Sequence, residues 1–256
     1  MKQKQKNKLI SVCSGSKGIG TTWFASTLCH VLAKIHRKIL FFDADGGYEN
    51  IAYQLDLKKS DLFMKLLKNN ITLNNAVTPY FKGHFDLIYN FSKENALMFY
   101  PTGRGQILAS DLKNFSLNYD EVIIDCSENN PKIKNILLNS SDRIILLFSP
   151  GLKSETEAYT ELEHIYKIAP KSEVYIVVNR ALSYNEGEQS YKTFCKASED
   201  FIGLKPKLLG VLLQDGNIRE SILNKTLFAN RYPDSSNLKD IKKMAELLTD
   251  GEKYAL

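Results

Sequence analysis

Short, continuous apolar runs alternate with segments of helical periodicity along most of this chain. Within a run, successive positions are apolar rather than every second one, which is typical of strands covered on both faces. Between the first two runs, Phe24, Leu28, Val31, Leu32 and Ile35 repeat at the spacing of one helix face. This alternation predicts an α/β fold, a doubly wound and mostly parallel sheet with helices on both faces. The runs are Leu9–Cys13, Ile39–Phe42, Phe85–Tyr89, Val122–Ile124, Ile144–Phe148, Val174–Val178 and Leu208–Leu213.

The length of 256 residues fits one α/β domain. No internal repeat, low-complexity block or Pro/Gly/Ser-rich linker divides the chain. We therefore predict a single domain over residues 9–256, preceded by a disordered basic tail over residues 1–8. Residues 69–118 have the least regular pattern, and we expect loops and short helices there, over the edge of the sheet.

A glycine-bearing loop follows the first predicted strand, and a helix is expected to begin at Trp23. A glycine-rich turn before a helix presents backbone N–H groups and the positive end of the helix dipole to an anion. The frame Gly15-x-x-x-x-Gly20 matches the spacing of a P-loop, and Thr22 stands where the Mg²⁺-binding hydroxyl belongs. Thr21 replaces the usual lysine. The predicted phosphate-binding residues are Gly15, Ser16, Lys17, Gly18, Ile19, Gly20, Thr21 and Thr22.

Acidic residues follow two further predicted strands. Asp43-Ala44-Asp45 comes after the second run, and Asp125 ends the run that begins at Val122. Ligands of open α/β sheets bind at the carboxyl ends of the strands, where carboxylates can orient water and interact with Mg²⁺ through its hydration shell. We expect Asp125 to hold Mg²⁺ with Thr22, and Asp43 and Asp45 to act in catalysis. The other interpretation of Asp43 and Asp45 is that of ordinary turn formers.

The segment Ser14–Leu28 resembles the deviant P-loop of the MinD/ParA ATPases, which reads roughly S-G-K-G-G-x-G-K-T-T before a helix. In that family the first, "signature" lysine reaches the phosphates of the partner subunit. Alignment places Ser16 at this position and Lys17 where the family has glycine. Lys17 is the candidate for the role because its stem is long and flexible; the alternative is that a side chain there distorts the loop. Thr21 in place of the second lysine implies slow hydrolysis.

Further motifs extend the resemblance over nearly the whole chain. Asp43-Ala44-Asp45 is similar to the family's D-x-D, whose second acid is tied to hydrolysis, and Tyr119–Asp125 is similar to Walker B. The segment after Asp125 lacks the glycine of the family's γ-phosphate switch. Asn179-Arg180 ends a segment similar to the family's V-V-N-R motif, whose Asn faces the adenine. An amide side chain can donate and accept hydrogen bonds at once, which suits contact with the edge of a base. Similarity to FlhG, the flagellar-number regulator of the family, lies in Ser183, Glu186-Gly187, Leu209-Gly210-Val211 and Tyr232–Ser235.

The resemblance implies a protein that binds ATP or ADP with Mg²⁺ and forms an ATP-dependent homodimer. Such a dimer acts as a switch in the placement of a cellular structure, in cell division, partition or flagellar positioning. Its ATP hydrolysis is expected to be weak or to depend on an activating protein partner. The alternative is a pseudo-ATPase of the same fold, a nucleotide-binding or empty scaffold for protein contacts. Thr21 and the missing switch glycine favour this alternative, whereas the acids, Thr22 and Asn179 favour the switch.

Composition and charge provide evidence on other classes of function and on location. Lys and Arg exceed Asp and Glu by 34 − 29 = 5, partly through residues 1–8, so charge is only weak support for nucleic-acid binding. The four cysteines form no CxxC pair, which disfavours a zinc site and fits free thiols in a reducing cytoplasm. No apolar run approaches the roughly 20 residues of a membrane helix, and we expect a cytoplasmic protein.

The C-terminal segment has an amphipathic pattern that allows two interpretations. It could lie on the inner face of a membrane, or it could be a last helix packed on the sheet, which we favour. The pattern consists of Leu238, Ile241, Lys242, Lys243, Ala245, Leu247 and Leu248.

Overall fold

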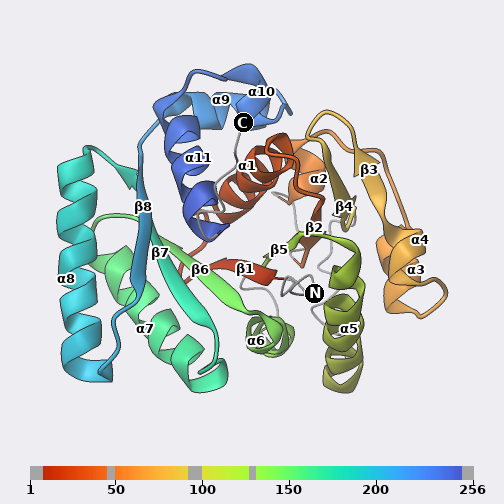
Figure 1. The fold of residues 1–256 in the computed structure, drawn as a ribbon, viewed down its shortest axis with the longest axis horizontal. Coiled ribbons are helices and arrows are strands. Elements are labelled where there is room, and N and C mark those ends of the chain that lie inside the picture. Colours follow the sequence, from red (N-terminus) through yellow and green to blue (C-terminus); the bar gives the residue numbers. More distant parts are fainter. Residues whose placement is uncertain (1–7, 45–49, 92–99, 127–130, 250–256) are drawn as a thin grey trace, which may run out of the picture.

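The computed structural model describes residues 8–44, 50–91, 100–126 and 131–249. These residues build an eight-stranded sheet with the order β3-β4-β2-β5-β1-β6-β7-β8 (Figure 1). All neighbours pair in parallel except β3 and β4, which are antiparallel. The predicted doubly wound sheet is therefore confirmed. Its strands are β1 Lys8–Ser14, β2 Ile39–Asp43, β3 Thr78–Tyr80, β4 Phe85–Ile88, β5 Glu121–Asp125, β6 Arg143–Phe148, β7 Glu173–Ala181 and β8 Lys207–Leu213.

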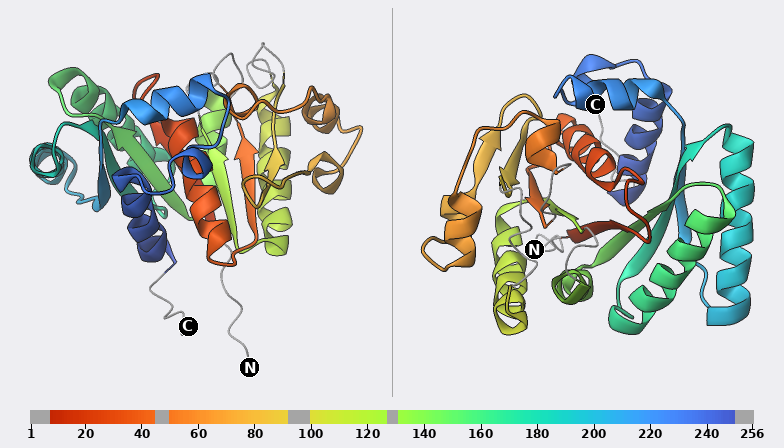
Figure 2. Two further views of the ribbon diagram at one scale, coloured as in Figure 1. Left: turned by 90° about the horizontal axis from the view of Figure 1, so that it is seen from above. Right: turned by 180° about the vertical axis from the view of Figure 1, so that it is seen from behind.

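Helices cover both faces of the sheet, as Figures 1 and 2 show. The face covered by α5, α6, α7 and α8 buries one apolar core, and the face covered by α1 and α11 buries the other. The helices are α1 Thr21–Lys34, α2 Ile51–Gln54, α3 Leu62–Leu67, α4 Leu73–Ala76, α5 Thr102–Phe115, α6 Pro131–Ser140, α7 Leu152–Ile168, α8 Tyr184–Ile202, α9 Gly216–Leu223, α10 Phe228–Arg231 and α11 Ser236–Leu248, with a 3₁₀ turn at Ser116–Asn118.

The central strands supply side chains to both cores, which explains why their sequences are apolar at successive positions. In β1, Leu9 and Cys13 point into the core under α5–α8, whereas Ile10 and Val12 point into the core under α1 and α11. All four side chains are fully buried or nearly so. Because successive side chains of a strand alternate between faces, a strand covered on both sides is apolar at most positions, and the buried Ser11 of β1 hydrogen-bonds to the Ser141 hydroxyl.

The prediction for residues 69–118 was wrong in two respects. The region contains α5, a helix of 14 residues, and the short edge strand β3 in addition to the short helix α4. Two glycines in the first turn of α5 lower its intrinsic helix propensity and obscured its apolar stripe. That stripe has the helical spacing i, i+3, i+4, i+7 and consists of Gly105, Leu108, Ala109 and Leu112, all of which are buried.

The C-terminal helix α11 packs inside the domain, against α1 and β8. Its apolar face is buried, whereas Lys242, Lys243 and Leu247 are exposed. The interpretation of this segment as a packed helix is thereby confirmed. In the described part of the chain, no helix combines the length and the apolarity that crossing a bilayer requires. The buried face of α11 consists of Leu238, Ile241, Met244, Ala245 and Leu248.

Candidate functional site

The carboxyl ends of the parallel strands bring several of the predicted site residues to one edge of the sheet. Asp43 at the end of β2 is the register partner of Asp125 at the end of β5, and Asp125 in turn pairs with Val12 of β1. Both aspartates are fully buried. The two carboxylates thus lie close to the loop after β1. In the sheet, β1 stands between β5 and β6. The strand order reverses there, and ligands of open α/β sheets bind at such a point.

The loop after β1 has the backbone conformation of an anion-binding turn. Gly18 and Gly20 have φ values of 72° and 101°, in the left-handed region that favours glycine. Gly20 caps α1, and its carbonyl accepts a 2.9 Å hydrogen bond from the amide of Phe24. The helix begins at Thr21, two residues earlier than predicted. The backbone amides of its first turn, which have no partner within the helix, therefore follow directly on the glycines of the loop. Backbone amides at a helix N-terminus can donate hydrogen bonds to a phosphate.

Gly15 holds the start of the loop against α7. A Cβ atom at this position would lie 2.3 Å from the carbonyl oxygen of Glu157 and 2.8 Å from the amide nitrogen of Ala158. These are backbone atoms of a helix and cannot move aside like a flexible side chain. A glycine is therefore required at residue 15 by close backbone approach, and the loop is seated on α7 as well as on β1.

The two candidates for the signature position differ in their surroundings. The Ser16 hydroxyl donates a hydrogen bond to the Glu157 carboxylate, and the Ser16 carbonyl accepts one of 2.7 Å from the Ser14 hydroxyl. Lys17 is exposed at the outer side of the loop. Ser16 is thus engaged by α7 within its own chain, whereas the ammonium group of Lys17 lies at the surface. The loop accommodates the side chain of Lys17 and places left-handed backbone at Gly18 instead.

Thr22 and Asp125 form the centre of the predicted metal site. The Thr22 hydroxyl donates a 2.5 Å hydrogen bond to Oδ2 of Asp125, and the two residues are 7% and 0% exposed. This donor set fits Mg²⁺, which prefers oxygen ligands and takes a P-loop hydroxyl together with phosphate oxygens and water. The described residues contain no cluster of three or more His, Cys, Asp or Glu side chains suited to a metal ion. Asp45, the second acid of the D-x-D motif, lies outside the described residues.

Asn179 and Arg180, near the end of β7, form hydrogen bonds with the backbone of the loop. The Asn179 amide donates a 2.7 Å hydrogen bond to the carbonyl of Ile19 and accepts one of 2.9 Å from the amide of Arg180. Arg180 has a φ of 63°, rare for a residue with a side chain, and its guanidinium donates to the carbonyl of Gly18. Both residues therefore hold the backbone of the loop. The prediction that Asn179 faces an adenine stays a prediction.

Sequence reasoning missed three residues that support the loop from α6 and α7. Glu157 accepts from Ser16, as described above, and Lys134 of α6 donates to the carbonyl of Ser14 at 3.4 Å. Lys134 is 7% exposed and forms an ion pair of 2.8 Å with Glu161 of α7. Glu157 lies in α7, outside the motifs described above. Lys134 lies in no motif, so only the packing of α6 under the loop identifies it.

The cysteines beside the loop are not activated nucleophiles. Burial raises the pKa of the Cys13 thiol well above its ordinary value and that of Cys126 to about 12. Both thiols are therefore neutral at physiological pH, and a neutral thiol is a poor nucleophile. Cys126 instead donates a weak hydrogen bond to the Ser11 hydroxyl. The chemistry of this edge of the sheet thus depends on oxygen and nitrogen groups.

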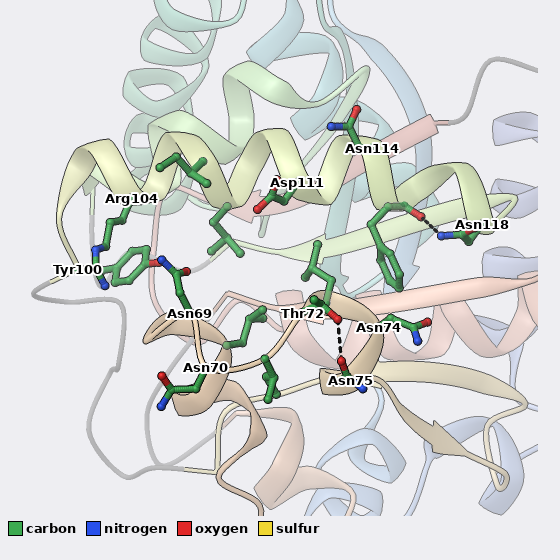
Figure 3. A pocket seen from close by; sticks show the side chains of 16 residues that line it. Asn69, Asn70, Thr72, Asn74, Asn75, Tyr100, Arg104, Asp111, Asn114 and Asn118 are labelled. Atoms are coloured by element: carbon green, nitrogen blue, oxygen red, sulfur yellow. Dashed lines mark hydrogen bonds between the residues drawn. The ribbon is translucent and has the colours of Figure 1, made fainter.

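A separate cavity of about 900 Å³ lies between α5 and the loop that contains α4 (Figure 3). Its lining is rich in asparagine and includes an arginine and an aspartate, and none of its lining residues belongs to the phosphate loop. The cavity is therefore not part of the site described above. The asparagines are Asn69, Asn70, Asn74, Asn75, Asn114 and Asn118.

Comparisons with known proteins agree with this geometry. The sequence model of the AAA domain matches residues 7–174. The flagellum site-determining protein YlxH of Helicobacter pylori is 22% identical over 246 residues, covering 96% of this chain and 83% of YlxH. The fold resembles that of the septum site-determining protein MinD complexed with Mg-ADP from Pyrococcus horikoshii, with a TM-score of 0.77, 20% identity and coverage of 94% and 96%. For the cell division ATPase MinD of Pyrococcus furiosus, the TM-score is 0.79 at 20% identity, with coverage of 95% and 98%. The chain therefore belongs to the AAA-domain family of P-loop proteins and, within it, to the MinD/ParA family of P-loop ATPases.

Proposed function

We propose that this protein binds ATP or ADP with Mg²⁺ at the loop Gly15–Thr22. The observation that carries the proposal is the 2.5 Å hydrogen bond between the Thr22 hydroxyl and the buried Asp125 carboxylate, at the N-terminus of α1. A helix N-terminus with left-handed glycines before it binds phosphate, and the hydroxyl–carboxylate pair beneath it suits a hydrated Mg²⁺. The MinD structure from Pyrococcus horikoshii, which is a complex with Mg-ADP, supports this assignment by similarity.

Each predicted residue has a distinct part in this proposal. The backbone of residues 15–20 and the first turn of α1 bind the phosphates, and Lys17 supplies positive charge from the exposed side of the loop. Thr22 would bind Mg²⁺ through its hydroxyl, and Asp125 would hold the ion through a water molecule. Asp43 and Asp45 orient the attacking water. When bound, the metal neutralises the negative charge that develops on the phosphate oxygens.

We further propose that the nucleotide controls an ATP-dependent homodimer that acts in the spatial placement of a cellular structure. The support comes from the relatives, since YlxH is a flagellum site-determining protein and MinD is a septum site-determining protein. The loop rests on α7 through Gly15 and Ser16, so a change of the loop on nucleotide binding would move groups at the surface beside α7. Thr21 lacks the charge of a P-loop lysine, and hydrolysis is therefore weak or depends on an activating protein.

The proposal also covers the location of the protein and its contacts with membranes and nucleic acid. We propose a single domain in the cytoplasm that begins at Lys8, the first residue of β1, one residue earlier than the predicted boundary because Lys8 pairs with Glu121 of β5. α11 buries the apolar side chains of its pattern except Leu247, so a membrane surface would find little apolar contact on this helix. The charge excess of five is weak support for nucleic acid, and we assign none.

A second candidate function is a pseudo-ATPase, which keeps the fold and the nucleotide but does not hydrolyse it. Two observations favour it, namely Thr21 at the lysine position and the intrachain bond that occupies Ser16 at the signature position. The two candidates share the nucleotide site and differ only in turnover.

Calorimetric titration of the purified protein with ATP and with ADP, each with Mg²⁺ and then with EDTA, tests the site. We expect saturable binding that weakens without Mg²⁺. Absence of binding at millimolar nucleotide would refute both candidates in their nucleotide-binding form and leave an empty scaffold. Phosphate release measured on the same sample then separates ATPase from pseudo-ATPase, with Asp125→Asn as the matched control.

A further inference from the structure

Two residues of β7 lie opposite one residue of β8 where β7 reaches the phosphate loop. Between the register pairs Val178–Val211 and Ala181–Leu213, β7 contains Asn179-Arg180 and β8 a single residue. An extra residue of this kind is a β-bulge, which bends the strand, re-aims its side chains and is rare between parallel strands. Bulges are common beside functional sites, so the contacts of these two side chains indicate what the bulge is for.

The backbone of Arg180 has a φ of 63°, in the left-handed region that a residue with a side chain rarely adopts. Its side chain is exposed, so burial does not explain this conformation. The guanidinium instead turns back onto the loop and donates a hydrogen bond to the carbonyl of Gly18. Strained residues persist only where the surrounding structure holds them, and they cluster at functional sites. The conformation of Arg180 therefore serves its contact with the loop.

Two successive carbonyl groups of the loop are held in this way. Arg180 binds the carbonyl of Gly18, and the Asn179 amide donates a 2.7 Å hydrogen bond to the carbonyl of Ile19. In a planar trans peptide, the C=O and the N–H point in opposite directions. The N–H groups of Ile19 and Gly20, which belong to these two peptides, therefore point away from the side chains that hold the carbonyls.

Both of these N–H groups are unused donors. Within residues 8–44, 50–91, 100–126 and 131–249, no acceptor takes a hydrogen bond from the N–H of Ile19 or of Gly20. In the sheet order, β5 with Asp125 stands on the opposite side of β1 from β7. Two backbone donors therefore turn away from β7 and are available to an anion bound beside the pair of Thr22 and Asp125.

We propose that the bulge positions the phosphate-binding amides: Arg180 turns the N–H of Ile19, and Asn179 that of Gly20, toward the phosphates of the nucleotide. Arg180 acts through the loop and touches no phosphate. Donors that already face an anion need no reordering when it binds, which raises affinity. The inference rests on the nucleotide site proposed above and adds to it how the loop is held ready for its ligand.

Arg180→Asn removes the guanidinium and keeps a residue that tolerates a positive φ. Its side chain is too short to reach the carbonyl of Gly18. We expect the dissociation constant of ADP with Mg²⁺ to rise about tenfold, the effect of one hydrogen bond from a charged donor. The midpoint of thermal unfolding should change by less than about 4 °C, because strain at residue 180 is relieved as the bond is lost. Arg180→Lys retains a donor of similar reach and should restore most of the affinity.

Backbone ¹H–¹⁵N spectra separate positioning from direct contact with the phosphate. A hydrogen bond to phosphate moves an amide proton downfield, so the N–H signals of Ile19 and Gly20 should move downfield when the unchanged protein is saturated with ADP and Mg²⁺. In Arg180→Asn the shift of Ile19 should be reduced most, and in Asn179→Ala that of Gly20. Inorganic pyrophosphate with Mg²⁺ should give the same pattern, and because it has no base, contact of Asn179 with a base does not explain it.

Equal affinities of Arg180→Asn and the unchanged protein would overturn the proposal. A lower affinity with an undiminished Ile19 shift would also overturn it, because the guanidinium would then contact the phosphate itself. Both results leave the proposed nucleotide site intact, since the unchanged protein still binds ADP. If the unchanged protein binds neither ADP nor pyrophosphate, the nucleotide site and the positioning role are refuted together.

Discussion

The Thr22 hydroxyl and the Asp125 carboxylate lie 2.5 Å apart, although 103 positions separate them in the sequence. One residue opens α1 and the other ends β5, so the bond exists only when the loop is seated over the sheet. A hydrogen bond to a charged group contributes about 1.5–3 kcal/mol. In the proposed complex, the same hydroxyl would exchange its carboxylate partner for Mg²⁺.

Replacing Thr22 tests this exchange. Thr22→Ala should lower the affinity for ATP in the presence of Mg²⁺ roughly ten- to a hundredfold, because the metal loses its protein hydroxyl. Thr22→Ser retains the hydroxyl and should bind nearly as the unchanged protein does. Calorimetry with Mg²⁺ and with EDTA measures both, and the three proteins should converge in EDTA. An alanine variant with undiminished Mg²⁺-dependent affinity would show that the metal is held elsewhere.

Lys17 and Ser16 compete for the role of phosphate-contacting residue in the loop. The exposure of Lys17 and the bond of Ser16 to Glu157 favour Lys17. Lys17→Ala should therefore weaken ATP binding roughly ten- to a hundredfold, the effect of one charge-assisted contact, whereas Ser16→Ala should change it much less. The measurement is the dissociation constant of each variant at low ionic strength. Equal values for the two variants would mean that the ammonium group of Lys17 stays in solvent.

Thr21→Lys should raise turnover. A lysine at this position places positive charge where the oxygen between the β- and γ-phosphates gains negative charge, and a hydroxyl cannot supply that charge. The double variant Thr21→Lys with Asp45→Ala should fall back, because it removes the acid that we assign to hydrolysis. Phosphate release by the unchanged protein, the single variant and the double variant is the test. If none of the three exceeds the buffer blank, the pseudo-ATPase is the correct function.

Two glycines of the loop should differ in what they contribute to stability. Gly15→Ala places a Cβ atom 2.3 Å from the Glu157 carbonyl oxygen, and relieving that overlap should cost about 1–3 kcal/mol of the free energy of unfolding. Gly18→Ala meets open space and costs only the strain of its positive φ, about 1 kcal/mol. Urea unfolding of both variants gives the comparison. A larger loss for Gly18→Ala would mean that the loop is not seated on α7.

The fold was largely predictable because the strands of a doubly covered sheet leave a simple pattern. Seven of the eight strands coincide with the seven apolar runs, since each of these strands is buried on at least one core face. β3 is three residues long, contains Pro79 and lies at the edge of the sheet, so it has no such run. α5 was missed because Gly103 and Gly105 stand in its first turn. Edge strands and glycine-bearing helices depend on their neighbours more than on their own residues.

The candidate site was predictable where it depends on neighbours in sequence and unpredictable where it depends on packing. The frame from Gly15 to Thr22 is local and could be recognised from spacing. The supports of the loop, Lys134 and Glu157, come from helices more than a hundred residues away, with separations of 120 and 141 positions from their partners. Asn179 donates to the carbonyl of Ile19, a contact across 160 positions that the sequence pattern does not indicate; its contact with a base stays a prediction.

Asn179 and Arg180 bond the loop across separations of 160 and 162 positions, which has a consequence for synthesis on the ribosome. The loop leaves the ribosome well before β7, whose residues Asn179 and Arg180 hydrogen-bond to it. A nascent chain in which Arg180 has not yet left the ribosome contains the complete loop but lacks the hydrogen bonds from Asn179 and Arg180 that hold it. The proposed nucleotide should therefore bind weakly to such a chain, and tightly only after β7 has joined the sheet late in translation.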